Sequence, residues 1–155
     1  MAVKFLIGHW TGGNYKPNKI DLASYQLLID DEGNVYEGKP QGTTNSVGGM
    51  NSITYNIACC GGLHRTPLKK EQCEKFFKVC ADKLKELGLT PKEFYTHAEI
   101  GRMCKTGYIG HFVFWNDYLK QNIGKVDLTV LPYDLEGLSS GDFIRDKIGW
   151  YSQNG

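Results

Sequence analysis

The sequence predicts an α/β (α+β) protein with a central mixed β-sheet flanked by helices. Several short apolar runs with strand character come first, and a long amphipathic helix and further short elements follow them. Strands and helices do not alternate strictly, so a mixed sheet fits better than a purely parallel one. A chain of 155 residues is long enough to bury one core, and we expect residues 1–155 to form a single domain.

The predicted strands are short and end at glycines or polar turns. The first covers about residues 3–8, and the glycine-broken segment after it is expected to be a loop. YQLLIDDEGNVYEG, residues 25–38, predicts a β-hairpin with its turn at Asp31–Asn34. ITYNIACCGG predicts a buried strand that ends at Gly61 and Gly62, and EFYTHAE, residues 93–99, predicts another short strand.

Three helices are predicted. Residues 68–88 carry an apolar stripe at helical spacing with charges opposite, and Gly88 is typical of a helix C-terminus. A weaker pattern covers residues 112–122, and GDFIRDKIGWY predicts a terminal amphipathic helix over residues 141–151. The segment GKPQGTTNSVGG lacks the order of a phosphate-binding loop, and we interpret it as a surface loop.

Charge and hydropathy disfavour several classes of partner. Lys and Arg number 18 against 17 Asp and Glu, a net charge of +1, which leaves no basic surface for nucleic acid or an anionic membrane. The apolar N-terminal run has only the length of a strand and lacks a cleavage site. We therefore expect a monomer made in a cytoplasm, with neither a nucleic acid nor a membrane as partner.

The five cysteines have no CxxC spacing, which argues against disulfides or a zinc ribbon and favours reduced thiols. Cys73 and Cys80 lie on the apolar face of the 68–88 helix. Cys59 and Cys60 could suggest a thiol nucleophile with His97 as its base. Because both lie inside an apolar strand, buried structural cysteines are the preferred interpretation.

Two of the four histidines, His9 and His97, end apolar strand-like runs where the chain turns away. Strand ends of this kind present side chains to a cleft, and neutral imidazole is a common zinc ligand. From the spacing alone, hydrogen-bonded structural histidines are the preferred interpretation, because a single histidine at a strand end is more often structural than a metal ligand. His64 and His111 lie in polar or glycine-rich stretches and are interpreted as loop residues.

Four motifs in this order resemble the zinc-dependent N-acetylmuramoyl-L-alanine amidase family, which includes phage endolysins and peptidoglycan recognition proteins. IGHWTGG resembles the family's first strand, and YQLLIDDEGNVYEG resembles its hairpin. VGGMNSITYNIACCGG resembles the strand that ends in glycine, and THAE resembles the segment with the second zinc histidine. The resemblance implies the fold of these amidases.

The resemblance also implies site residues. His9 and His97 would bind Zn²⁺, and Tyr25 would be the catalytic side chain, because Ala58 stands where many members have a glutamate. The third ligand is either Asp127, in GKVDLTVLP, or Cys104, and the match around GKVDLTVLP favours Asp127. Two further residues, Lys105 and Glu99, remain candidates for a second electrophile and for support of the ligands.

The implied activity is hydrolysis of the amide between N-acetylmuramic acid and L-alanine in peptidoglycan. A phage endolysin made in the host cytoplasm and a muropeptide-recycling enzyme both fit. Trp10, Tyr36 and residues 42–52 could line the substrate cleft or could equally be ordinary core edge and loop. Two alternatives stay open: a non-catalytic peptidoglycan-binding module of the same fold, and a thiol peptidase that uses Cys60 or Cys104 with His97.

Overall fold

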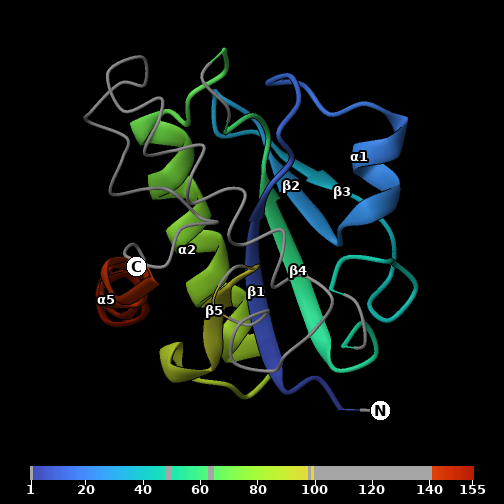
Figure 1. Ribbon diagram of the computed structural model, residues 1–155. Helices are drawn as coiled ribbons and strands as arrows, with labels where there is room; N and C mark the ends of the chain where they lie inside the picture. Colours follow the sequence, from blue (N-terminus) through green and yellow to red (C-terminus); the bar gives the residue numbers. More distant parts are fainter. Residues whose placement is uncertain (1, 48–49, 63–64, 98, 100–140) are drawn as a thin grey trace.

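The computed structural model describes residues 2–47, 50–62, 65–97, 99 and 141–155. Five strands form one mixed sheet in the order β3-β2-β4-β1-β5 (Figure 1). The strands are β1 (Phe5–Trp10), β2 (Leu27–Ile29), β3 (Val35–Glu37), β4 (Thr54–Cys59) and β5 (Phe94–Thr96). The mixed sheet, the hairpin and the strands expected around residues 3–8, 53–62 and 93–99 are therefore confirmed.

Parallel pairing brings the ends of β1 and β5 together. The strand β1 is parallel to both β4 and β5, whereas β2 is parallel to β4 and antiparallel to β3. Gly8 of β1 lies opposite Thr96 of β5. Since parallel strands have their carboxyl ends at one edge of the sheet, His9 and His97 follow this pair at neighbouring positions.

One face of the sheet packs against α2 (Lys70–Glu86) and α5 (Gly141–Asn154), which lie together at the left of Figure 1. The buried face of α2 supplies Cys73, Phe76, Phe77, Cys80 and Leu84 to a core that α5 completes with Ile144 and Ile148. The helices predicted over residues 68–88 and 141–151 are thus confirmed. Gly88 follows α2 with a φ of 73°, as its C-terminal position predicts.

The opposite face of the sheet is covered by α1 (Lys19–Ser24) and the chain around Val47 and Met50. The prediction of a loop between the first strand and the hairpin was wrong at α1. Asn18 begins this helix through a capping box, in which its side chain accepts from the Asp21 backbone N–H and the Asp21 carboxylate accepts from the Asn18 N–H. Six residues carry too little apolar periodicity to be recognised.

The 41–52 segment is a surface loop only in part. Thr44, Ser46 and Val47 are buried, because Val47 packs on Ile7 of the sheet while the two hydroxyls join a polar network described below. The Ser and Thr content suggested solvent exposure, but small polar side chains are buried when hydrogen bonds satisfy them.

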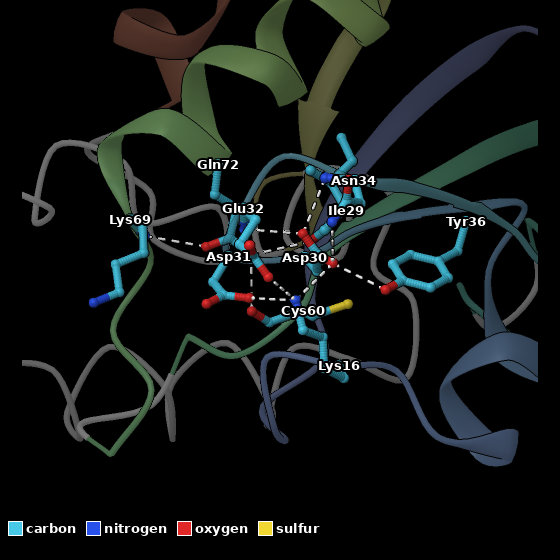
Figure 2. A network of polar contacts seen from close by, with 10 residues as sticks. All are labelled: Lys16, Ile29, Asp30, Asp31, Glu32, Asn34, Tyr36, Cys60, Lys69 and Gln72. Carbon is cyan, nitrogen blue, oxygen red and sulfur yellow. Dashed lines mark hydrogen bonds and ion pairs between the residues drawn. The ribbon is translucent and has the colours of Figure 1, made fainter.

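The hairpin turn is held by one buried carboxylate and one lysine, as Figure 2 shows. Lys16 Nζ lies 3.0 Å from Asp30 and also contacts Asp31 and Glu32. The Asp30 carboxylate accepts further hydrogen bonds from Glu32 N, Asn34 N, Asn34 Nδ2 and the Tyr36 hydroxyl. Burial alone would raise the pKa of Asp30, but the bonds from Lys16 and its other donors hold it well below its usual range.

The terminal helix is tied to the segment that follows β5. Arg145 of α5 donates two parallel hydrogen bonds to the Glu99 carboxylate, at 2.9 and 3.0 Å, and a third to the Phe94 carbonyl. Glu99 Oε1 also accepts from the Thr96 backbone N–H at 3.0 Å. Glu99 therefore holds the chain on both sides of His97 in place, and it is not simply solvated.

Several residues and one helix predicted from the sequence lie outside the part of the chain that the structure describes. The helical pattern at 112–122 and the residues Cys104, Lys105, His111 and Asp127 lie outside the described residues, as does His64. The cysteines at 59, 60, 73 and 80 are buried free thiols, as expected. Among the described residues, no helix has the length and apolar character needed to cross a membrane.

We expect Arg145→Met to lower the free energy of unfolding by roughly 2 kcal/mol, between the values typical of exposed and fully buried ion pairs. The reason is that Glu99, whose side chain is 12% exposed, loses its bidentate partner. Denaturant unfolding followed by circular dichroism would measure the change.

The matched control is Lys147→Met on the same helix, because Lys147 Nζ lies 3.6 Å from Glu74 in a more exposed pair. That variant should lose less than about 1 kcal/mol. Equal losses in the two variants would show that the Arg145 contact has no special role.

Candidate active site

His9 is a buried side chain on the sheet face opposite α2. His9 is only 1% exposed, and it is the second-last residue of β1. Successive side chains of a strand point to opposite faces, so Gly8 and Trp10 face the other way. A Cβ on Gly8 would come within 2.7 Å of the Phe94 ring, so glycine allows this ring to pack directly beneath the strand that carries His9.

His97 lies beside His9. It follows β5 directly, is 6% exposed, and its ring centroid is 4.8 Å from that of His9 with the rings edge to face. The two histidines are separated by 87 intervening positions in sequence and meet because β1 and β5 are parallel neighbours. The sequence expectation that each histidine lies at or near the end of a strand agrees with this geometry.

Tyr25 is a second aromatic neighbour of His9. It is the C-cap residue of α1, and its ring centroid is 5.0 Å from that of His9. The Tyr25 carbonyl accepts from Lys39 N at 3.0 Å, and a Cβ on Gly38 would come within 2.0 Å of the same oxygen. Glycine at position 38 therefore permits the tight backbone contact that seats Tyr25.

Asn56 is a contact of His9 that the sequence interpretation missed. The Asn56 side-chain oxygen lies 2.8 Å from His9 Nε2, and both residues are buried. Register explains the contact: Asn56 of β4 lies opposite Ile7 and shares its face of the sheet with His9. A signal was present, since an asparagine inside the apolar run ITYNIACC needs a buried hydrogen-bond partner.

A chain of buried polar groups continues from Asn56. Gln26, at the start of the hairpin, accepts from the Asn56 backbone N–H at 2.7 Å and donates to Thr44 at 2.9 Å. Thr44 is hydrogen-bonded to Ser46, which in turn donates to the Ser24 carbonyl. None of these four side chains was singled out from the sequence, because their partners come from distant segments.

The imidazoles of His9 and His97 have the spacing that a shared zinc ion requires. Two imidazoles on one tetrahedral ion, with Zn–N distances of about 2.0–2.1 Å, hold their ring centroids about 5 Å apart. The His9–His97 separation of 4.8 Å agrees with this spacing. The candidate third ligands Asp127 and Cys104 lie outside the described residues, so the described part of the site supplies two candidate ligands.

Within the described ranges, Asp30, Asp31 and Glu32 form a second group with metal-ligand spacing. The Lys16 ammonium already lies among these carboxylates, within 3.1 Å of each. A lysine in this place supplies the positive charge, so the group serves the hairpin turn.

The remaining candidates are structural in the described part of the chain. Burial raises the pKa of Cys60 to about 12, which disfavours the thiolate that a thiol peptidase would need. Trp10 is buried with its ring against Gly62, and the Tyr36 hydroxyl donates to Asp30. Trp10 is therefore a core residue, and Tyr36 stabilises the hairpin turn.

Solved structures share this fold. The N-acetylmuramoyl-L-alanine amidase LysC from Clostridium intestinale matches with a TM-score of 0.55 at 15% identity, covering 64% of this chain and 73% of that one. Staphylococcus aureus hydrolase AmiA, in complex with its ligand, matches with 0.58 at 14% identity over 97% and 73%. Human PGRP-IBETAC, in complex with glycosamyl muramyl pentapeptide, matches with 0.52 at 18% identity over 64% and 74%.

No curated protein matches the sequence. The family model described as N-acetylmuramoyl-L-alanine amidase matches residues 1–108, which include His9, Tyr25 and His97. This match covers more than half of the chain and agrees with the fold of the solved structures. The chain therefore belongs to the N-acetylmuramoyl-L-alanine amidase family.

Proposed function

We propose that this protein is a zinc-dependent N-acetylmuramoyl-L-alanine amidase that hydrolyses the amide between N-acetylmuramic acid and L-alanine in peptidoglycan. The observation that carries the proposal is the meeting of His9, His97 and Tyr25 on one sheet face, in a chain of this family. The family is generally zinc-dependent, and two buried imidazoles side by side supply suitable ligands.

In this proposal His9 and His97 hold the ion together with one residue from the segment after β5, for which Asp127 is preferred to Cys104. A zinc ion bound there would activate water and polarise the scissile carbonyl as a Lewis acid. Both imidazoles are buried, and the packing around them limits the rotation of their rings.

Tyr25 is the proposed catalytic side chain. Its ring stands beside His9, so its hydroxyl is a candidate donor to the substrate oxygen that gains negative charge when water attacks. A tyrosine hydroxyl carries one O–H group that can donate such a hydrogen bond. No glutamate is available at position 58 of β4, where the chain has alanine.

A second candidate function is peptidoglycan binding without cleavage. Human PGRP-IBETAC, with the same fold, was solved in complex with glycosamyl muramyl pentapeptide, which makes recognition of such ligands a property compatible with this architecture. In both candidates residues 1–155 act as one domain with peptidoglycan as the partner. A phage endolysin and a muropeptide-recycling enzyme remain the two settings proposed for the amidase.

The proposal predicts that the purified protein releases free peptide amino termini from bacterial cell walls. A strong chelator should abolish release and added Zn²⁺ should restore it, because the ion activates the water. Iodoacetamide should leave the rate unchanged, since the four described cysteines are buried and the proposal gives the fifth, Cys104, no part in the reaction. Wall binding without release would favour the binding module, and loss of release on alkylation alone would favour a thiol peptidase.

Tyr25→Phe should lower turnover about 10²- to 10³-fold, the usual cost of removing one donor to a developing oxyanion. Zinc content, measured by atomic emission, should stay at the level of the unaltered protein because Tyr25 is not a proposed ligand. The matched control is Tyr15→Phe, which removes a hydroxyl bonded to the Pro67 carbonyl in another part of the fold. Near-normal turnover of Tyr25→Phe would remove this residue from the mechanism.

The third ligand is tested by comparing the zinc content of Asp127→Ala and Cys104→Ala. We expect Asp127→Ala to bind zinc at least tenfold more weakly and Cys104→Ala to keep its affinity, since losing a direct ligand costs at least as much as losing a supporting contact. The opposite pattern would assign the role to Cys104.

A further inference from the structure

We propose that Asn56 is a positioning residue that keeps His9 in the tautomer protonated on Nε2, so that Nδ1 carries the lone pair for a metal. The inference rests on the proposed function for the role of the metal, whereas the tautomer itself is a property of the metal-free protein. It assigns a task to the buried Asn56–Gln26 pair, which the proposed reaction does not otherwise use.

Three backbone groups fix the direction of every hydrogen bond around Asn56. The Asn56 backbone N–H can only donate, and it donates to Gln26 Oε1 at 2.7 Å. At the other end of the Gln26 amide, Nε2 points to the Pro40 carbonyl, which can only accept. The Gln26 amide is thereby oriented with its oxygen towards Asn56.

The orientation of the Asn56 amide follows. Its Nδ2 lies 3.2 Å from Gln26 Oε1 and 3.1 Å from Thr54 Oγ1, and both are acceptors here because Thr54 donates its own proton to the Met50 carbonyl. The Asn56 Oδ1 is then the atom that faces His9 Nε2 at 2.8 Å. A carboxamide oxygen has no proton, so the imidazole must be the donor.

The hydrogen bond from His9 Nε2 to Asn56 Oδ1 decides which nitrogen of His9 can bind a metal. A neutral imidazole has one N–H and one lone pair, so protonation on Nε2 leaves the lone pair on Nδ1. A hydrogen bond to the other nitrogen is the usual way in which proteins select the tautomer and ring orientation of a histidine ligand. Asn56 makes this bond from inside the sheet, where the neighbouring strand holds its backbone.

The same network reaches the backbone next to Tyr25. Gln26 donates to Thr44 Oγ1, Thr44 is bonded to Ser46 Oγ at 2.8 Å, and Ser46 donates to the Ser24 carbonyl. The His9 ring and the residue before Tyr25 are therefore two ends of one buried chain of hydrogen bonds. Such a fully satisfied network is rigid, which suits groups that must keep a fixed mutual position.

The test compares Asn56→Leu with Gln72→Leu. Gln72 is also a fully buried amide, and it donates to the Ile29 and Cys60 carbonyls from α2 on the other side of the sheet (Figure 2). Both variants remove one buried amide, but only Asn56→Leu removes the partner of His9. Asn56→Ala is the second variant if Asn56→Leu does not fold.

The first readout is long-range ¹H–¹⁵N NMR of the metal-free protein, at a pH well above the ordinary pKa of histidine. We expect His9 to show a protonated Nε2 and an unprotonated Nδ1 in the unaltered protein and in Gln72→Leu. In Asn56→Leu or Asn56→Ala the signals should move towards a mixture of tautomers. A protonated Nδ1 in the unaltered protein would overturn the inference at once.

The second readout is zinc affinity, measured by competition with a fluorescent chelator. Asn56→Leu should bind zinc about 10- to 100-fold more weakly than Gln72→Leu, the range found when the partner of a histidine ligand is lost. Equal affinities, or an unchanged His9 spectrum in the Asn56 variants, would refute the positioning role. Failure of the unaltered protein to bind zinc would instead refute the proposed function, while the His9 spectrum still decides the tautomer.

Discussion

The parallel pairing of β1 with both β4 and β5 is the constraint on which the site depends. It places the carboxyl ends of three strands at one edge, so a side chain near the end of each can meet the others. His9 lies near the carboxyl end of β1, and His97 directly follows the carboxyl end of β5. Asn56 reaches His9 from β4, where it lies opposite Ile7. If β1 paired one residue out of register, His9 would turn to the α2 face, where Phe94 and Phe76 fill the space.

Local sequence pattern was sufficient to predict the larger secondary-structure elements and the turn residues at which they end. The hairpin, α2 and α5 follow from alternation, helical periodicity and turn chemistry, all of which act over a few residues. His9, Tyr25 and His97 were named from the sequence through family motifs, and the structure places their rings side by side, while their zinc-binding and catalytic roles stay predictions. What local pattern could not give was α1, whose capping box is short, and the Asn56–Gln26–Thr44 chain, whose partners lie 18 to 30 residues apart.

The burial of these polar side chains explains why their hydrogen-bond network was harder to predict from the sequence. Gln26, Thr44 and Ser46 have side chains that are ordinary in exposed loops, and only Asn56, with apolar residues around it in ITYNIACC, carried a signal of burial. They are buried because they satisfy each other, which is a property of the assembled sheet and not of any segment. Asp30 follows the same rule in the hairpin, where Lys16 and four other donors compensate for its burial.

The contact between Arg145 and Glu99 joins the two ends of residues 100–140, because Arg145 lies just after this segment and Glu99 just before it. Glu99 lies two residues after His97, and the ion pair brings the beginning of α5 back to this position. Insertions or deletions between the two ends would leave the distance to be spanned unchanged. Evolution could therefore alter this segment, which contains both candidates for the third ligand, independently of the histidine pair.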